Sequence, residues 1–285
     1  MTQQKKHTKL ENALYVVATP IGNMADITFR AVDVLKNCNI ILCESPKNSY
    51  NLLKHYDIDC SKILTYNDHS NSHQRQKILN FLQENNSISL ISDAGTPLIS
   101  DPGYKLVNYL RQQQQKIIPI PGPSSLISAI SASGIACDNF TFLGFLPNLK
   151  SKRKDLIKDN KNNSFVFFES ARNLLKSLSE IIEFIDDRNC CVAKEITKIH
   201  EELVINKISD IISFLEKNNN KLKGEFVVII EKSNKLQNKI SNSDLIDEIK
   251  KLHNKKMSLK DISQNLAEIY NLNKKEIYKK ALEII

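Results

Sequence analysis

Residues 87–103 read SISLISDAGTPLISDPG, an apolar run that passes directly into a loop of small and acidic residues. The run 87–92 is short and bounded by turn residues, which is typical of a buried strand, and a helical pattern follows from about residue 101. A strand, a tight loop and a helix in this order make one βα unit. Gly95 lets the loop backbone approach a ligand closely, and Asp93 stands where the strand ends.

The same alternation extends outward along the chain. Strands are predicted at 13–18, 39–43, 87–92 and 116–120, and helices at 27–36, 48–56, 74–84 and 101–113. Strands and helices that alternate in this way predict an α/β fold with a mostly parallel sheet, which binds ligands at the carboxyl ends of its strands. In the second half, strands are predicted at 140–145, 164–168, 190–194, 202–206 and 225–231, with a helix at 171–185.

Three domains are expected from this organisation. All eight prolines and six of the seven glycines lie before residue 148, so tight turns are concentrated in the first half. We predict an N-terminal α/β domain over 13–121, a second α/β domain over 122–235 and a helical extension over 240–285. In the extension, apolar residues at helical spacing and a turn near Asn271 weakly resemble a helix-turn-helix, and packing against a second copy is an equal alternative.

Composition excludes several classes of protein. The chain has 285 residues, 41% hydrophobic and 25% charged, as in a globular protein that buries a sizeable core. No apolar run is long enough for a membrane span, and the polar first twelve residues do not predict a signal peptide. The six cysteines include no C-x-x-C pair, which argues against a structural zinc site. We therefore expect reduced cysteines and a cytoplasmic location. The formal charge of +8 favours a polyanionic partner without proving one.

Two further loops of small residues follow predicted strands, at 18–23 and 119–125. Neither contains G-x-G-x-x-G, and the chain lacks G-x-x-x-x-G-K-[ST], so a standard dinucleotide site and nucleotide triphosphate hydrolysis are disfavoured. Ser124 or Ser125 could cap the next helix, and Asp101 before Pro102 could cap the helix that follows it. These capping roles are the structural alternatives to ligand binding.

Taken together, residues 14–23, 92–103 and 120–124 resemble the loops of the tetrapyrrole methylase superfamily, most of all its branch that methylates small-subunit ribosomal RNA. The likeness continues in order through shorter motifs at residues 144–147, 168–170, 194–202 and 223–225. It implies methylation of a cytidine ribose 2′-hydroxyl in the decoding region of 16S ribosomal RNA, dependent on S-adenosylmethionine (SAM). It also implies two α/β domains with SAM in the cleft between them, a homodimer, and the RNA or the 30S particle as partner.

Carried over by position, the residues that the resemblance places beside SAM are Thr19, Pro20, Gly22, Asp93, Gly95, Thr96, Ser124 and Ser125. Their hydroxyl, carboxylate and backbone groups suit the ribose, the amino-acid group and the adenine edge of SAM. In-line methyl transfer is mainly a matter of positioning, helped by a base, and it requires no metal. Glu44, after the second predicted strand, is the candidate base, and an ion pair with Lys47 or Arg75 is its alternative role.

Some positions depart from the family pattern and leave the substrate side open. The family carries Glu-Asp-Thr-Arg where this chain has Glu44-Ser-Pro-Lys47, and lysine gives up the bidentate phosphate contact of arginine. The family also carries Pro-His-Arg where this chain has Ala171-Arg-Asn173, so Arg172 is a candidate to replace the shifted charge. The alternatives are a precorrin-type tetrapyrrole C-methyltransferase and a non-catalytic RNA-binding relative.

Cationic side chains are the expected contacts to RNA phosphates. Residues 150–155 form a basic, flexible-looking stretch whose alternative role is a solvated loop. The predicted RNA-binding residues are Lys47, Lys150, Lys152, Arg153, Lys154 and Arg172.

Overall fold

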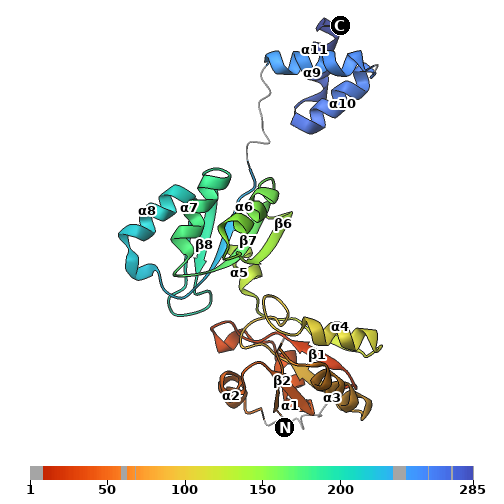
Figure 1. Ribbon diagram of the computed structural model, residues 1–285, viewed down its shortest axis with the longest axis vertical. Coiled ribbons are helices and arrows are strands. Elements are labelled where there is room, and N and C mark those ends of the chain that lie inside the picture. The colour runs from red at the N-terminus through yellow and green to blue at the C-terminus, as the bar shows by residue number, and fades with distance from the viewer. Residues whose placement is uncertain are drawn as a thin grey trace, which may run out of the picture. The chain divides into compact units, whose positions relative to one another are not determined.

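The structure is a computed structural model, and it describes residues 9–58, 63–67, 69–233, 242–255, 257–270 and 272–284 (Figure 1). The chain divides into two compact units, residues 1–231 and 232–285. The described part of the first unit contains two five-stranded sheets, and that of the second contains three helices. The predicted α/β class, with two sheets in succession and a helical C-terminal segment, is confirmed.

The first sheet is entirely parallel, with strand order β3-β2-β4-β1-β5. Its strands are β1 (Leu14–Val17), β2 (Ile40–Cys43), β3 (Ile63–Thr65), β4 (Ile88–Leu90) and β5 (Ile117–Ile120). The helices between them are η1 (Met24–Asp26), α1 (Phe29–Asn37), α2 (Pro46–His55), α3 (Ser72–Gln83) and α4 (Tyr104–Gln112). Strand β3 was not predicted, because three residues at a sheet edge are too short to show a period.

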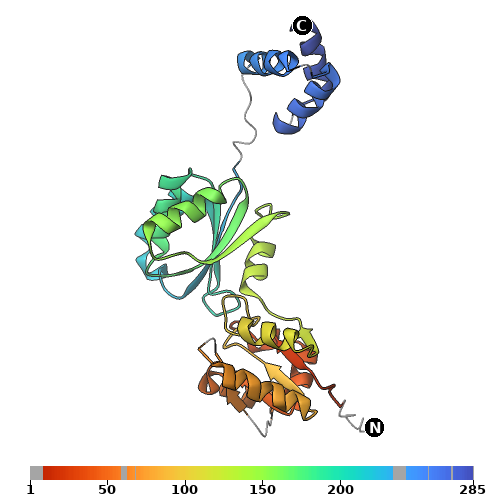
Figure 2. The ribbon, with the colours of Figure 1, turned by 45° about the vertical axis from the view of Figure 1, so that its right-hand side comes forward.

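Helices cover both faces of the first sheet (Figures 1 and 2), and the side chains of its strands alternate between these two faces. Tyr15 and Ile41 pack with α1 and α2, whereas the neighbouring Leu14 and Leu42 pack with α3 and α4. Helices on both faces explain why the strands are apolar throughout. Because parallel strands share a direction, the loops that follow β1, β4 and β5 gather at one edge of the sheet.

The second sheet is mixed, with strand order β6-β7-β10-β8-β9, in which only β6 and β7 run parallel. Its strands are β6 (Phe140–Phe145), β7 (Ser164–Ser170), β8 (Asn189–Lys194), β9 (Glu202–Lys207) and β10 (Glu225–Ile230). Helices α6 (Lys150–Asp159), α7 (Leu174–Phe184) and α8 (Ile208–Lys217) cover one face, followed by η2 (Asn219–Lys221). Helix α5 (Ser125–Ala132) packs on the opposite face, against Val166 and Val227.

The second unit has its own small core. Helices α9 (Asn242–Asn254), α10 (Leu259–Tyr270) and α11 (Lys274–Ile284) bury Leu245, Ile249, Ile262, Leu266, Ile277 and Ala281. The predicted turn residue Asn271 and the predicted domain ends at 235 and 240 lie outside the described residues. The predicted division at 121/122 falls between β5 and α5, but residues 1–231 form one unit, so that boundary stays a prediction.

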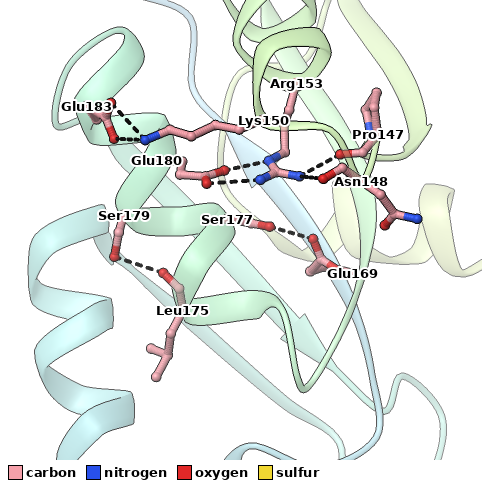
Figure 3. Close-up of polar contacts among 10 residues, drawn as sticks. All are labelled: Pro147, Asn148, Lys150, Arg153, Glu169, Leu175, Ser177, Ser179, Glu180 and Glu183. Carbon is pink, nitrogen blue, oxygen red and sulfur yellow. Dashed lines mark hydrogen bonds and ion pairs between the residues drawn. The ribbon is translucent and has the colours of Figure 1, made fainter.

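Residues 150–155 differ from expectation, because they form the start of helix α6 rather than a flexible stretch. Arg153 is only 5% exposed, and Figure 3 shows its guanidinium aimed at Glu180 of α7. Both carboxylate oxygens of Glu180 accept from it, with Nη2 at 2.9 Å from Oε1. Nη1 donates to the backbone oxygens of Pro147 at 2.6 Å and Asn148 at 3.1 Å. Arg153, predicted to contact RNA, is therefore a buried clamp between α6, α7 and the end of β6.

This clamp generates a stability prediction. We expect Arg153→Ala to lower the free energy of unfolding by about 3–5 kcal/mol, because the Glu180 carboxylate would stay buried without its cation. The double variant Arg153→Met/Glu180→Leu should recover most of that stability, since it leaves no charge uncompensated. Urea unfolding measures both, with the exposed Lys152→Ala as control, expected within about 0.5 kcal/mol of the parent. Equal, small decreases for all three variants would contradict the clamp.

The hydrogen bond from Arg153 holds the pKa of Glu180 below its usual value. A depressed carboxyl pKa stabilises the fold above the unfolded-state pKa of about 4.3, and this contribution is lost as the pH falls through the folded-state pKa. The difference between Arg153→Ala and the parent should therefore shrink in acid.

Candidate active site

A cavity of about 380 Å³ lies between the carboxyl edge of the first sheet and the second sheet, within the first unit. Its volume is in the range of small-molecule sites. One wall comes from the loops after β1, β4 and β5, and it includes Gly95, Thr96, Ser124 and Ser125. The other wall comes from the carboxyl ends of β6, β7 and β8, from the start of β10 and from the loop 195–198.

Hydrogen bonds between and within the loops hold the first wall in place. Thr19 and Gly95 form an isolated bridge, with Thr19 N to Gly95 O at 2.8 Å and Gly95 N to Thr19 O at 3.1 Å. The hydroxyl of Ser92 donates to the backbone oxygens of Ala94 and Gly95. Thr96 Oγ1 donates to Pro123 O at 3.0 Å and so joins the loop after β4 to the loop after β5.

Backbone strain is present on both sides of the cavity. Ser100 (φ +62°) and Glu195 (φ +48°), which line the cavity, have left-handed backbones, and so do Leu98 (φ +74°) and Thr197 (φ +67°) in the same two loops. Each such residue costs on the order of 1–3 kcal/mol and persists only where its surroundings enforce it. Four strained non-glycine residues around one hollow are typical of a functional site.

The turn after β1 packs tightly against the second wall. A Cβ atom on Gly22 would lie 2.5 Å from Cγ of Lys198 and 2.8 Å from Oγ1 of Thr197, so only glycine fits there. The neighbouring Asn23 N donates to Thr197 Oγ1 at 3.1 Å. The predicted SAM residue Gly22 thus brings the two walls together.

The cavity wall is acidic and apolar. Among the described lining residues, four carboxylates stand against one ammonium, which gives a formal charge of −3 in a chain whose total is +8. The charged residues are Asp101, Glu169, Glu195, Glu225 and Lys198. The large apolar residues are Ile21, Ile99, Phe145, Phe168, Ile196 and Phe226.

Most of these carboxylates have strong partners. Glu169 accepts from Ser170 N at 2.8 Å and from Ser177 Oγ at 2.6 Å. Lys198 Nζ lies 3.0 Å from both Glu195 Oε1 and Glu225 Oε2. Hydrogen bonds from the backbone of Glu225 and from Lys198 lower the pKa of Glu195, although burial acts in the opposite direction as its largest single influence.

Asp101 differs from the other carboxylates. Burial raises its pKa to about 6, a hydrogen bond with Ser92 opposes the rise, and the charges of Glu44, Asp93 and Glu225 add to it. The sequence suggested a capping role, but α4 begins at Tyr104 with Gly103 at the N-cap position. Asp101 therefore lines the cavity without capping the helix, and sequence reasoning missed it because the pattern Asp-Pro has a common structural use.

The structure separates the predicted SAM residues into two groups. Gly95, Thr96, Ser124 and Ser125 line the cavity. Thr19, Pro20, Gly22 and Asp93 flank it, and the exposed Asp93 carboxylate accepts from Asn48 Nδ2 at 2.7 Å. Glu44 is half-buried after β2 and is not among the lining residues, so the structure does not bring the candidate base to the cavity wall.

The predicted RNA contacts, apart from Arg153, lie at the surface. Lys47, Lys152, Lys154 and Arg172 are exposed, and Lys150 forms an exposed ion pair with Glu183 at 2.9 Å. Arg172 follows Ser170, a cavity residue, by two positions.

The cavity fits SAM on chemical grounds. The sulfonium and ammonium groups of SAM are cationic and match the acidic wall, and the adenine ring matches the apolar side chains. The start of α5 at Ser125 offers backbone N–H groups, which suit a carboxylate. Gly95, at φ +76°, lets the backbone approach closely.

Over the part of the chain that the structure describes, no helix is both long and apolar enough to cross a bilayer. The same residues contain no cluster of three or more side chains with the donors and spacing to hold a metal ion.

The chain is similar in sequence to a known protein family and in fold to solved structures. Residues 13–212 match the family of tetrapyrrole (corrin/porphyrin) methylases. Two structures with this fold are cobalt-precorrin-4 methyltransferase (TM-score 0.56, 16% identity, 80% of this chain and 97% of that one) and uroporphyrin-III C-methyltransferase from Thermus thermophilus (0.52, 14%, 77% and 94%). At these identities the likeness shows the fold alone.

Curated relatives are much more similar. The protein named ribosomal RNA small subunit methyltransferase I of Rickettsia prowazekii (strain Madrid E) is 42% identical over 276 residues, covering 94% of this chain and 96% of that protein. The protein of the same name from Escherichia coli O157:H7 is 36% identical over 285 residues, covering 98% and 99%. The chain therefore belongs to the tetrapyrrole methylase family, in the group of the ribosomal RNA small subunit methyltransferases I.

Proposed function

We propose that this chain transfers the methyl group of SAM to the ribose 2′-hydroxyl of a cytidine in the decoding region of 16S ribosomal RNA. The observation that carries the proposal is an acidic, partly apolar cavity of about 380 Å³ in a chain that is otherwise basic. Such a site suits a cationic methyl donor, while the basic surface suits a polyanionic acceptor. The names of the near full-length relatives support ribosomal RNA as the acceptor.

The residues that would hold SAM come from three loops. The backbone N–H groups of Ser124 and Ser125, at the start of α5, would bind the carboxylate of SAM. The backbone of Gly95 and Thr96 would lie against another side of the SAM molecule. Asp93, held by Asn48 at the cavity edge, would accept from its hydroxyl or amino groups. SAM supplies a methyl group on a positively charged sulfur, and the chain supplies orientation and exclusion of water.

The RNA would be held at the surface around the cavity. Exposed cations at Lys47, Lys152, Lys154 and Arg172 would bind phosphates, with Lys150 as a further contact when its ion pair with Glu183 opens. The acceptor would be the RNA or the 30S particle, in the cytoplasm. We further propose a homodimer, as the resemblance to the family implies, which light scattering would test.

Mapping of 2′-O-methylation tests the function directly. Ribosomal RNA from cells with and without this gene should differ at one cytidine of the decoding region, and the purified protein with SAM should restore the mark. Restoration by incubation with SAM alone would contradict the proposal. Methylation of a tetrapyrrole in place of RNA would favour the precorrin-type alternative, and SAM binding without transfer would favour a non-catalytic relative.

A variant of Asp93 tests the SAM site. We expect Asp93→Ala to weaken SAM binding by about 10- to 150-fold in calorimetry, because a hydrogen bond to a charged group contributes about 1.5–3 kcal/mol. The fold should be preserved, since Asp93 is an exposed loop residue. Asn48→Ala, which removes the group that orients Asp93, should have a smaller effect in the same direction. Unchanged SAM affinity in folded Asp93→Ala would remove Asp93 from the site.

The cations of α6 generate a salt-dependence prediction. Lys152→Ala/Lys154→Ala should weaken RNA binding and lower the log–log salt slope by roughly 0.7–0.9 for each phosphate that the variant no longer neutralises, with SAM affinity unaltered. Arg153 is excluded from the variant because its replacement would disturb the fold. Lys207→Ala/Lys217→Ala removes the same charge from exposed positions at β9 and α8 and is the matched control. Equal salt slopes for the two double variants would show that the cations of α6 are solvated and do not contact RNA.

A further inference from the structure

A second hollow, of about 710 Å³, lies beside the candidate active site within the first unit. Its described lining comes from the end of β8, the start of β9 and the residues between η2 and β10. Successive side chains of a strand point to opposite faces, and on β8 Ala193 lines the cavity whereas Lys194 lines the second hollow. At β8 the two hollows thus lie on opposite faces of the second sheet. We call the second hollow the lysine groove, after Lys194, Lys221 and Lys223.

The lysine groove and the cavity share a rim made of Glu195 and Gly224. Gly224 has φ +90°, and a Cβ atom there would lie 2.4 Å from Oε1 of Glu195, so both its backbone and this contact require glycine. The same carboxylate oxygen accepts from Glu225 N at 2.9 Å and from Lys198 Nζ at 3.0 Å. The rim is therefore held in place, and one extended ligand can lie across it and contact both hollows.

Each carboxylate of the lysine groove already has a partner within the protein. Glu202 forms an ion pair with Lys221. Glu201 accepts from Thr197 N at 2.5 Å. Glu195 is held at the rim by the two hydrogen bonds described above. These carboxylates are engaged, so the charges left for a ligand in the groove are positive.

The remaining charges are the ammonium groups of Lys194 and Lys223. Within the residues that the structure describes, neither lysine forms an ion pair, and Lys223 is exposed. The exposed His200 adds a ring nitrogen that can donate to the same ligand. Ammonium groups form strong, charge-assisted hydrogen bonds with phosphate oxygens. A ligand with a phosphate in the groove and a ribose in the cavity is a nucleotide chain.

The lysine groove and helix α6 belong to opposite edges of the second sheet. The strand order is β6-β7-β10-β8-β9, and the groove is lined by the end of β8 and the start of β9. Helix α6 begins five residues after Phe145, the last residue of β6 and part of the cavity wall. An RNA strand that contacts the lysines of α6 therefore reaches the groove only by passing the cavity.

We propose that the lysine groove binds the backbone of single-stranded RNA next to the cytidine that receives the methyl group, with Lys194 and Lys223 as its phosphate contacts. The inference rests on the proposed function and adds a second place at which the chain holds its substrate. Phosphates occur at every nucleotide, so the groove positions the strand without reading its sequence. An unpaired strand fits best, because its nucleotides can be splayed into separate sites.

The central experiment is the double variant Lys194→Gln/Lys223→Gln, which removes both charges and keeps a polar side chain at each position. The full chain is titrated with an RNA oligonucleotide of the decoding region over a range of salt concentrations. The log–log salt slope should fall by roughly 0.7 for each phosphate that loses its lysine, or about 1.4 for two, and the affinity by about tenfold near physiological salt. SAM affinity should stay unchanged, since neither lysine lines the cavity.

Three further variants control this experiment. Lys161→Gln/Lys207→Gln removes the same charge from exposed positions at the other end of the second sheet and should keep the salt slope of the parent. Lys194→Arg/Lys223→Arg keeps both charges and should bind RNA within about threefold of the parent. Lys223→Gln alone leaves β8 untouched and should lower the slope by roughly 0.7, which tests the groove even if replacement of Lys194 disturbs the fold.

Methylation rates separate binding from chemistry. Below saturation with RNA, the rate of Lys194→Gln/Lys223→Gln should fall by about tenfold, in step with its affinity. At saturating RNA, its single-turnover rate should lie within about threefold of the parent, because the groove does not touch the reacting atoms. An equal decrease under both conditions would place the lysines in the transfer step and contradict a binding role.

The outcomes distinguish this inference from the proposed function. If the parent methylates RNA and Lys194→Gln/Lys223→Gln keeps its salt slope and affinity, the inference is overturned and the function stands. If the variant loses affinity for the 30S particle but not for the oligonucleotide, the groove contacts a protein surface, which also overturns the inference. If the parent does not methylate RNA, the proposed function fails, while the salt slope of RNA binding still tests the groove.

Discussion

Two backbone hydrogen bonds between Thr19 and Gly95 join the loop that follows β1 to the loop that follows β4. This junction fixes the two loops beside each other on the first wall of the cavity. The hydroxyl of Ser92 adds a hydrogen bond within the loop after β4, and the hydroxyl of Thr96 adds one to Pro123 in the loop after β5. On the other side, Gly22 lies against Thr197 and Lys198 with no space for a side chain. The loops of the parallel sheet are thereby held against the second sheet, and the cavity is the space that remains between them.

Much of the fold was predictable from the sequence, because it depends on short-range patterns. Short apolar runs separated by amphipathic segments predicted the strands and most helices, and residues of the loops 92–103 and 119–125 line the cavity at the edge of the first sheet. Strand β3 escaped prediction because its three residues at the sheet edge are too few to show a period. Its pairing with β2 is visible only in three dimensions.

Arg153 and Asp101 show why side-chain roles were harder to predict. Arg153 stands among lysines in a run that is typical of a solvated surface, and its partner Glu180 lies 27 positions away on another helix. Asp101 stands before a proline, where the sequence favours a cap, yet the helix begins three residues later. In both cases the local sequence pattern indicates a common role for the residue, whereas contacts with residues distant in sequence determine its actual role.

The charge of the cavity wall has a consequence for the end of the proposed reaction. Methyl transfer removes the positive charge from the sulfur, so the product that remains in the cavity has one cationic group fewer than the donor that entered. The wall of formal charge −3 therefore attracts the donor more strongly than the product. The electrostatics that favour donor binding would therefore hold the product more weakly, which favours its exchange for a new donor.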